Sequence, residues 1–133
     1  MKYDTFIGEV ENRARLPSRG DAVRAVQATL ETLAERIRAG EADDLAAQLP
    51  EEIGTYLRDV ETTERFDVDE FFLRVAAKET ADLPDATHHA RAVIDVLQDA
   101  VTAGELEDVK GQLPDNYKPL FEAGSEGEMD ISL

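Results

Sequence analysis

Two short acidic segments are the residues of this 133-residue chain best suited to bind a hard cation. Glu41, Asp43 and Asp44 recur 64 positions later as Glu105, Glu107 and Asp108. Carboxylate oxygens are the ligands that Mg²⁺ and Ca²⁺ prefer. However, the chain has no Asp-x-Asp-x-Asp-Gly followed by a distal Glu, the pattern of a calcium-binding loop. Acidic side chains also stabilise the positive end of a helix dipole, and the sequence favours this structural interpretation.

The two histidines of the chain, His88 and His89, are adjacent. Neighbouring residues on a helix point about 100° apart, so one metal ion cannot easily bind both rings. We expect His88 to face solvent and His89 to flank the apolar side of its helix. A structural or neutral role is therefore favoured over a metal site.

Several other polar residues have a ready structural explanation. Gln48 and Gln112 each precede a Leu-Pro pair. They are either a polar pair in a groove between two repeats or side chains that satisfy carbonyls at a helix end, and the second interpretation is favoured. Ser18 is predicted to cap a helix, since no His base lies near it in sequence. Asp67 and Glu70 are predicted to form a capping box.

The remaining signals exclude several kinds of chemistry. The chain has no Cys, so thiolate chemistry and disulfides are absent. Its eight Gly residues are scattered and form no phosphate-binding loop. The sequence therefore assigns no catalytic, cofactor-binding or metal-ligating residue, and it favours a protein that is not an enzyme.

The charge balance is strongly acidic. Thirty acidic residues oppose fourteen basic ones, for a net charge of −16. Such a surface repels nucleic acids and anionic lipids, and Arg13, Arg15 and Arg19 are expected to form only a solvated face. The acidity is explained either by adaptation to a salt-rich cytoplasm or by an acidic surface for a basic partner. The even spread of the acids and the presence of only four Lys favour salt adaptation.

The sequence predicts a soluble cytoplasmic protein. No apolar run approaches the roughly 20 residues that span a bilayer. The N-terminal residues lack the charged and then apolar pattern of a signal peptide.

A repeat sets the expected architecture. Residues 33–50 recur as residues 97–114 without a gap, which indicates two copies of one helical unit. Apolar residues at steps of three and four mark the longest helix of each copy. In the first copy these are Val23, Val26, Leu30, Leu33 and Ile37, and in the second they are Thr87, Ala90, Ile94, Leu97 and Val101.

Each copy is predicted to hold four helices, which makes the fold class all-α. The first helices are expected at about residues 4–15 and 68–80, and the third at about 41–48 and 105–112. Pro50 and Pro114 are expected to open the fourth helices, the second of which Pro119 makes short or irregular. Gly40 and Gly104 stand where a left-handed cap of the long helix is expected.

We expect residues 1–121 to form one helical domain with approximate internal two-fold symmetry. Its repeats are about residues 3–57 and 68–121, joined by a polar linker at 58–67, and residues 122–133 are expected to be an acidic, flexible tail. Each long helix is expected to face the core of its own unit. Tyr56, Phe66 and Phe72 are expected to seal the joint.

Residues 33–50 read Leu-Ala-Glu-Arg-Ile-Arg-Ala-Gly-Glu-Ala-Asp-Asp-Leu-Ala-Ala-Gln-Leu-Pro. Together with the Asp-x-Phe segments at Asp4 and Asp69, this segment resembles an uncharacterised prokaryotic family, domain of unknown function family 2267. The chain looks like a salt-adapted member, and the resemblance covers about residues 3–121. The second copy departs from the family pattern at Lys110-Gly111 and at Pro119. The resemblance implies a duplicated helical fold and carries no activity, cofactor or catalytic residue.

Two functions remain open. One is a non-catalytic protein-interaction or accessory module, with a protein partner or a second copy of the chain bound at a groove between the repeats. The other is a small-ligand-binding protein or an enzyme that uses carboxylates in that groove. A concave pocket holding a buried carboxylic acid of raised pKa favours the second function. An exposed apolar patch favours the first.

Overall fold

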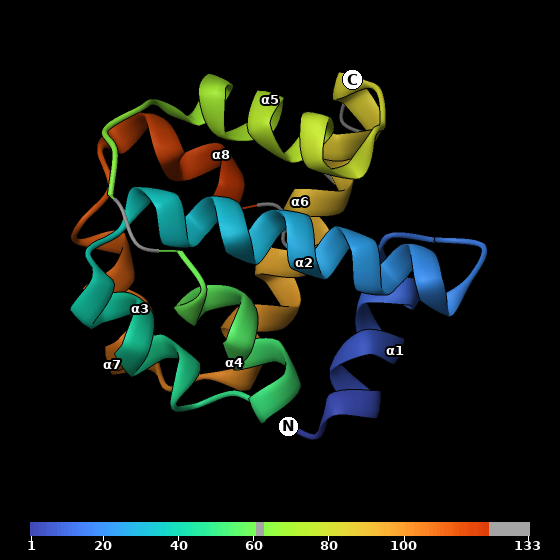
Figure 1. Cartoon of the computed structure of the whole chain (residues 1–133), viewed down its shortest axis with the longest axis horizontal. Helices are drawn as coiled ribbons and strands as arrows, with labels where there is room; N and C mark the ends of the chain where they lie inside the picture. The colour runs from blue at the N-terminus through green and yellow to red at the C-terminus, as the bar shows by residue number, and fades with distance from the viewer. Residues whose placement is uncertain (61–62, 123–133) are drawn as a thin grey trace.

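The computed structural model describes residues 1–60 and 63–122, and all regular structure in these ranges is helical (Figure 1). The α-helices are α1 (Tyr3–Arg13), α2 (Arg19–Arg36), α3 (Ala39–Ala46), α4 (Glu51–Arg58), α5 (Val68–Glu79), α6 (Leu83–Ala100), α7 (Ala103–Lys110) and α8 (Lys118–Phe121), with a 3₁₀ turn, η1 (Asp115–Tyr117), before α8. The predicted all-α class is confirmed. The predicted flexible tail falls, from residue 123 onward, outside the described residues, as do residues 61–62 of the predicted linker.

The element boundaries follow the predicted pattern to within two residues. The short η1 and α8 stand where Pro119 predicted an irregular fourth helix. None of the helices in the described ranges combines the length and apolar character needed to cross a bilayer.

Side-chain caps explain where several helices begin. The Ser18 hydroxyl accepts a hydrogen bond from the Asp21 amide at 3.1 Å, which confirms the predicted cap of α2. Asp67 Oδ1 accepts from the Glu70 amide at 3.0 Å at the start of α5. The Glu70 side chain instead accepts from Arg74 Nε at 3.0 Å, so only half of the predicted capping box forms.

The prediction of left-handed glycine caps is wrong. Helices α2 and α6 end before Ile37 and Val101, whose backbones are extended. The side chain of Ile37 is fully buried, so core packing holds the chain in this extended break. Gly40 and Gly104 are instead the second residues of α3 and α7, which begin two residues earlier than predicted. No glycine in the described ranges has a positive φ.

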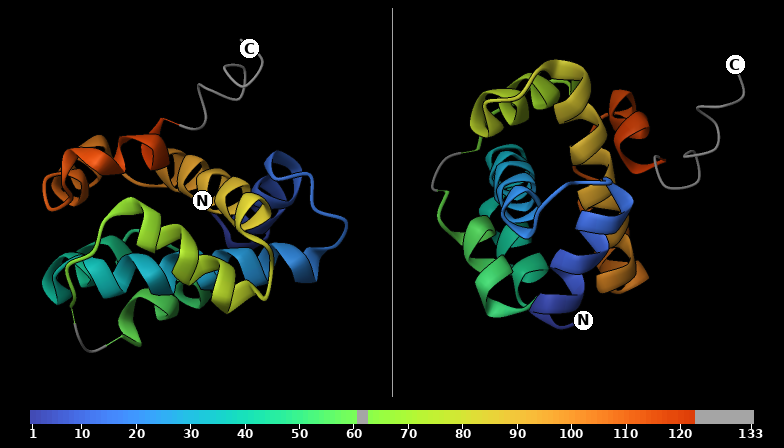
Figure 2. Two further views of the ribbon diagram at one scale, coloured as in Figure 1. Left: turned by 90° about the horizontal axis from the view of Figure 1, so that it is seen from above. Right: turned by 90° about the vertical axis from the view of Figure 1, so that its right-hand side faces the viewer.

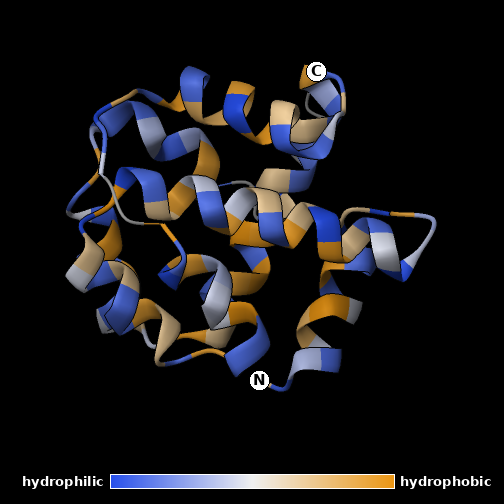
Figure 3. Cartoon of the chain, viewed as in Figure 1, coloured by the Kyte–Doolittle hydropathy of each residue, from blue (hydrophilic) through white to orange (hydrophobic). Residues whose placement is uncertain are grey.

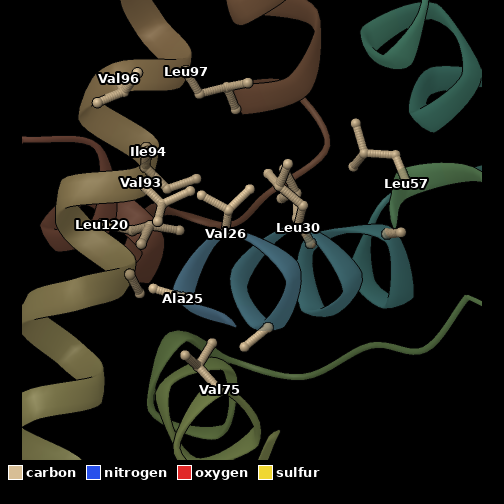
Figure 4. Close-up of a cluster of buried hydrophobic side chains, with 14 of the residues drawn as sticks. Ala25, Val26, Leu30, Leu57, Val75, Val93, Ile94, Val96, Leu97 and Leu120 are labelled. Carbon is tan, nitrogen blue, oxygen red and sulfur yellow. The ribbon is translucent and has the colours of Figure 1, made fainter. Parts of the chain in front are cut away.

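The buried side chains form one core that both halves of the chain share. Helix α2 packs against α1 and α4 of the first half and also against α5 and α6 of the second half (Figures 1 and 2). Figure 4 shows the residues where these elements meet: Val26 and Leu30 of α2, Leu57 of α4, Val75 of α5, Val93 and Ile94 of α6, and Leu120 of α8. The expectation of a separate core for each unit is therefore wrong, because the predicted apolar stripes of α2 and α6 enter a common cluster.

The described part of the linker is bound to the helical body. The Glu64 amide donates to the Glu35 carbonyl at 2.7 Å, at the end of α2. Arg36 Nε and the Tyr117 hydroxyl both donate to the Phe66 carbonyl at 2.8 Å. The Arg74 guanidinium lies 3.9 Å from the centre of the Phe66 ring. Phe66 is half-buried and packs against the common core.

Candidate functional site

A surface hollow of about 780 Å³ lies where the ends of α1 and α5 meet the starts of α2 and α6. We call it the α1/α5 hollow. One side is lined by Ala14, Arg15, Leu16, Pro17, Asp21 and Arg24, and the other by Glu79, Thr80, Ala81, Asp85, His88 and His89. Each half of the chain thus contributes one helix end, one connecting turn and one helix start to the same cavity.

Left-handed residues shape both sides of this hollow. Arg15 has a φ of 54° and Thr80 a φ of 56°, the two positive values among non-glycine residues of the described ranges. The left-handed conformation costs an L-residue with a side chain roughly 1–2 kcal/mol. Such backbone outliers gather at functional sites when the surrounding structure holds them in place. Both outliers in this structure line the same cavity.

Two charge pairs line the hollow, and the side chain of Arg15 belongs to neither of them. Arg24 donates to Asp21 at 3.0 Å, and this hydrogen bond lowers the pKa of Asp21. The ring of His89 lies 2.8 Å from an oxygen of Glu79, whose side chain is largely buried. That hydrogen bond raises the pKa of His89, and the charges of Asp85 and Asp21 act in the same direction. The side chain of Arg15 is exposed and has no hydrogen-bond or ion-pair partner within the described residues.

The structure places both histidines in this hollow. His88 is exposed and His89 half-buried, as predicted, and His88 Nε2 donates to the Ala14 carbonyl at 3.2 Å. Sequence analysis missed Glu79, which lies at the C-terminal end of α5 and carries no motif. Its distinguishing signal is burial, since only 8% of this carboxylic acid is exposed.

The Glu79→Gln variant should lose stability mainly at acidic pH. Because Glu79 raises the folded-state pKa of His89, the stabilisation is complete below the unfolded value of about 6.5. It is lost as the pH rises through the higher folded value. A hydrogen bond to a charged group contributes about 1.5–3 kcal/mol, so we expect a loss of about 2 kcal/mol at pH 5.5 and a smaller one at pH 9. Urea unfolding at both pH values measures this. Equal losses at both would contradict the assignment, and Glu107→Gln, on an exposed side chain, is the control.

A second polar site lies between the starts of α3 and α7, which pack side by side (Figure 1). Gln48, which follows α3, accepts from the backbone amide of Thr102, the N-cap of α7, at 2.8 Å. Gln112, which follows α7, accepts from the amide of Arg38, the N-cap of α3, at 2.9 Å. The predicted role at carbonyls is therefore wrong. Each glutamine instead caps the start of the opposite helix, a contact that arises only when the two halves dock.

This exchange of caps leaves two glutamates facing each other. Glu41 and Glu105 are the third residues of α3 and α7, where a capping box would direct each carboxylate to its own N-cap amide. Gln48 and Gln112 occupy those amides instead. Carboxylate oxygens of Glu41, Glu105 and Asp108 lie within 4.8 Å of one another, and we call these three residues the acidic cluster.

Glu105 is the least exposed member of the acidic cluster, at 7%. Burial and the neighbouring Glu41 raise the pKa of Glu105 to about 8, and the charges of Asp44 and Asp108 add to this effect. One oxygen of Glu41 and one of Glu105 are buried without a hydrogen-bond partner. Of the acidic residues identified from the sequence, some therefore belong to the acidic cluster and others lie outside it. Asp43 instead faces Arg58, at 3.5 Å, and Glu107 is exposed.

The basic trio does not form a patch. Arg13 pairs with Asp95 at 2.7 Å and Asp99 at 2.8 Å, and Arg19 pairs with Asp4. Only Arg15 remains, and it lines the α1/α5 hollow.

A comparison with models of known protein families finds a match. The family model described as "Uncharacterized conserved protein (DUF2267)" matches residues 3–120. The match includes both the α1/α5 hollow and the acidic cluster. A search of curated proteins finds no match to the chain.

Proposed function

Because the chain belongs to this family of uncharacterized conserved proteins, whose description states no activity, we propose its function from the geometry alone. The protein is a binding protein that holds a small anionic molecule in the α1/α5 hollow. The observation that carries this proposal is the guanidinium of Arg15, which lines the cavity without a protein partner. The cavity volume of about 780 Å³ lies within the roughly 300–1,000 Å³ of small-molecule sites.

The charges of the hollow favour an anion. Asp21 is already paired with Arg24 and Glu79 with His89, so neither acid needs a cationic ligand. Asp85 lies in the first turn of α6, where the helix dipole stabilises its charge. The guanidinium of Arg15 is planar and presents paired donors that match a carboxylate or phosphate group. A small molecule bearing one of these groups is therefore the ligand class.

Surface composition supports a ligand site over a protein-interaction surface. An interaction module would be expected to expose a contiguous apolar patch. In the described ranges, the exposed large hydrophobic residues are Met1, Leu73 and Leu83, on three different segments. Figure 3 shows most of the hydrophobic positions of the helices on the sides that face other helices.

Thermal unfolding with a set of anions tests this function. We expect at least one phosphate or one mono-, di- or tricarboxylate to raise the Tm at constant ionic strength. Arg15→Gln should abolish that shift, because it removes the guanidinium and keeps a side chain at the left-handed position. Lys2→Gln removes one exposed charge outside the hollow and should preserve the shift. The proposal fails if no anion raises the Tm or if both variants respond alike.

The internal duplication is also part of this proposal. In it, residues 1–121 form one domain from two repeats, about 3–57 and 68–121, related by approximate two-fold symmetry. The reciprocal caps support it, since Gln48 and Arg38 lie 64 positions before Gln112 and Thr102. The α1/α5 hollow supports it too, because each repeat contributes six lining residues. The ligand site then lies between the repeats, as the groove hypothesis required.

We also propose that the net charge of −16 adapts the protein to a salt-rich cytoplasm. At 1 M salt the Debye length is about 3 Å, so repulsion between exposed carboxylates is screened. At millimolar salt the repulsion acts over the whole surface and destabilises the compact state. We predict that helicity and Tm fall as KCl is lowered from molar to millimolar concentration. Circular dichroism during thermal unfolding measures this, and unchanged curves would refute salt adaptation.

A further inference from the structure

We propose that Glu41, Glu105 and Asp108 form a binding site for one divalent cation of the Ca²⁺ type, between the starts of α3 and α7. The first observation is distance, since one oxygen of each carboxylate lies within 4.8 Å of the other two. Two oxygens bound to one Ca²⁺ at about 2.3–2.6 Å lie at most about 5 Å apart, so the spacing of these three oxygens is compatible with one shared ion. The site is separate from the α1/α5 hollow and does not depend on the function proposed there.

The second observation is the buried, unpartnered carboxylate of Glu105. Its side chain is more than nine-tenths buried, and its Oε2 has no hydrogen-bond partner. The Oε2 of Glu41, in the facing helix, is also inaccessible and unpartnered. Buried carboxylate oxygens without a donor are unfavourable, so a group that compensates them is strongly stabilised. A cation held between the two glutamates compensates both.

The surrounding hydrogen bonds direct the glutamates toward this point. Gln112 caps Arg38 and also donates from Nε2 to Glu41 Oε1 at 3.0 Å. That bond holds one oxygen of Glu41 and leaves the other for the ion. Because Gln48 occupies the Thr102 amide, Glu105 has no backbone donor at its own N-cap. Hydrogen bonds that orient ligand carboxylates in this way are typical of metal sites.

Electrostatics favours a cation despite the nearby helix starts. Each helix N-terminus acts as roughly half a positive charge. The three carboxylates of the acidic cluster, together with Asp44, outweigh the two helix ends. Ca²⁺ tolerates irregular coordination, whereas Mg²⁺ demands a near-octahedral shell at about 2.0–2.1 Å. Since Asp108 is exposed, water completes the shell of the ion on that side.

Calcium titration of the full chain tests this site. After treatment with EDTA and its removal, isothermal titration with CaCl₂ in constant KCl at pH 8 should give one Ca²⁺ per chain and a higher Tm. MgCl₂ at the same ionic strength should bind more weakly. Glu105→Gln and Asp108→Asn should each weaken Ca²⁺ binding by at least about tenfold, because affinity follows the number of charged ligands.

Matched variants separate the site from general charge effects. Glu107→Gln and Asp43→Asn remove one charge each from the same two helices, outside the acidic cluster, and should bind Ca²⁺ like the unmodified chain. Asp108→Asn changes an exposed side chain, so we expect this variant to fold like the unmodified chain. The proposal is overturned if the unmodified chain binds no Ca²⁺, or if the variants inside and outside the acidic cluster bind it equally.

Discussion

In EDTA at pH 7, the Glu105→Gln variant should be more stable than the unmodified chain by about 2 kcal/mol. Folding buries the Glu105 carboxylate beside Glu41, and these surroundings raise its pKa to about 8. The unfolded side chain, with a pKa of about 4.3, is ionised at neutral pH. Folding therefore requires proton uptake or the burial of a second negative charge, and each costs free energy. Glutamine keeps the shape, removes the charge and supplies an amide donor for Glu41.

Urea unfolding measures this gain, with Glu107→Gln as the control. The control lies on the same helix and is exposed, so its stability should change by less than about 0.5 kcal/mol. A Glu105→Gln variant less stable than the unmodified chain would show that the ionised carboxylate makes a favourable contact within the protein. A variant that is stabilised in EDTA and no longer responds to Ca²⁺ has lost a ligand and kept its fold.

The Gly54→Val variant should lose about 2–3 kcal/mol of stability. Gly54 lies in α4, where a Cβ atom would be 3.0 Å from the Ala46 carbonyl oxygen and 3.3 Å from the Ala46 Cβ. Both obstructing atoms belong to Ala46 of α3: one is its backbone oxygen and the other is its Cβ. Neither atom can move by rotation of a side chain, so the overlap cannot be relieved in that way. Valine adds two methyl groups to this contact. The helices must separate, and the packing of α4 against α3 is lost.

Gly40→Val is the matched comparison for this prediction. A Cβ at Gly40 meets nothing within 4 Å, and its φ is negative. Valine has a slightly better helix propensity than glycine, so we expect a change near zero or a small gain. Denaturant unfolding of both variants measures and compares their free energies of unfolding. A costly Gly40→Val and a tolerated Gly54→Val would reverse the packing described here and restore the left-handed cap that the sequence predicted.

Local features of the fold were predictable, because local residues determine them. The 3.6-residue period of Val26, Leu30 and Leu33 marks a helix whatever that helix packs against. The Ser18 cap and the short final helix at Pro119 also follow from nearby residues. Docking of the halves was not predictable, since the stripes of α2 and α6 would serve two separate cores as well as one.

The two candidate sites also differ in how much of each could be predicted from the sequence. The sequence identified Glu41 and Glu105 as acids able to hold a hard cation, because their types and positions recur. It could not show that they face each other, since that depends on Gln48 and Gln112 crossing between helices. One available signal was that Thr102 and Glu105 read as a capping box, whereas Arg38 and Glu41 do not. The α1/α5 hollow carries no pattern, because Arg15 and Glu79 lie at helix ends where no periodicity applies.

The exchanged glutamine caps couple the folding of the two halves. Helix α3 obtains its N-terminal cap from Gln112, and α7 obtains a second cap, besides Thr102, from Gln48. The Thr102 hydroxyl caps α7 within its own half, since it accepts from the Glu105 amide at 3.2 Å, whereas Arg38 supplies no side-chain cap to α3. The start of α3 therefore receives its side-chain cap only after the other half has docked. An intermediate with only the first half folded therefore lacks the cap of α3 in addition to its share of the common core, which makes it doubly unfavourable. Because both halves share one core and exchange these contacts, we expect the chain to unfold in a single cooperative transition.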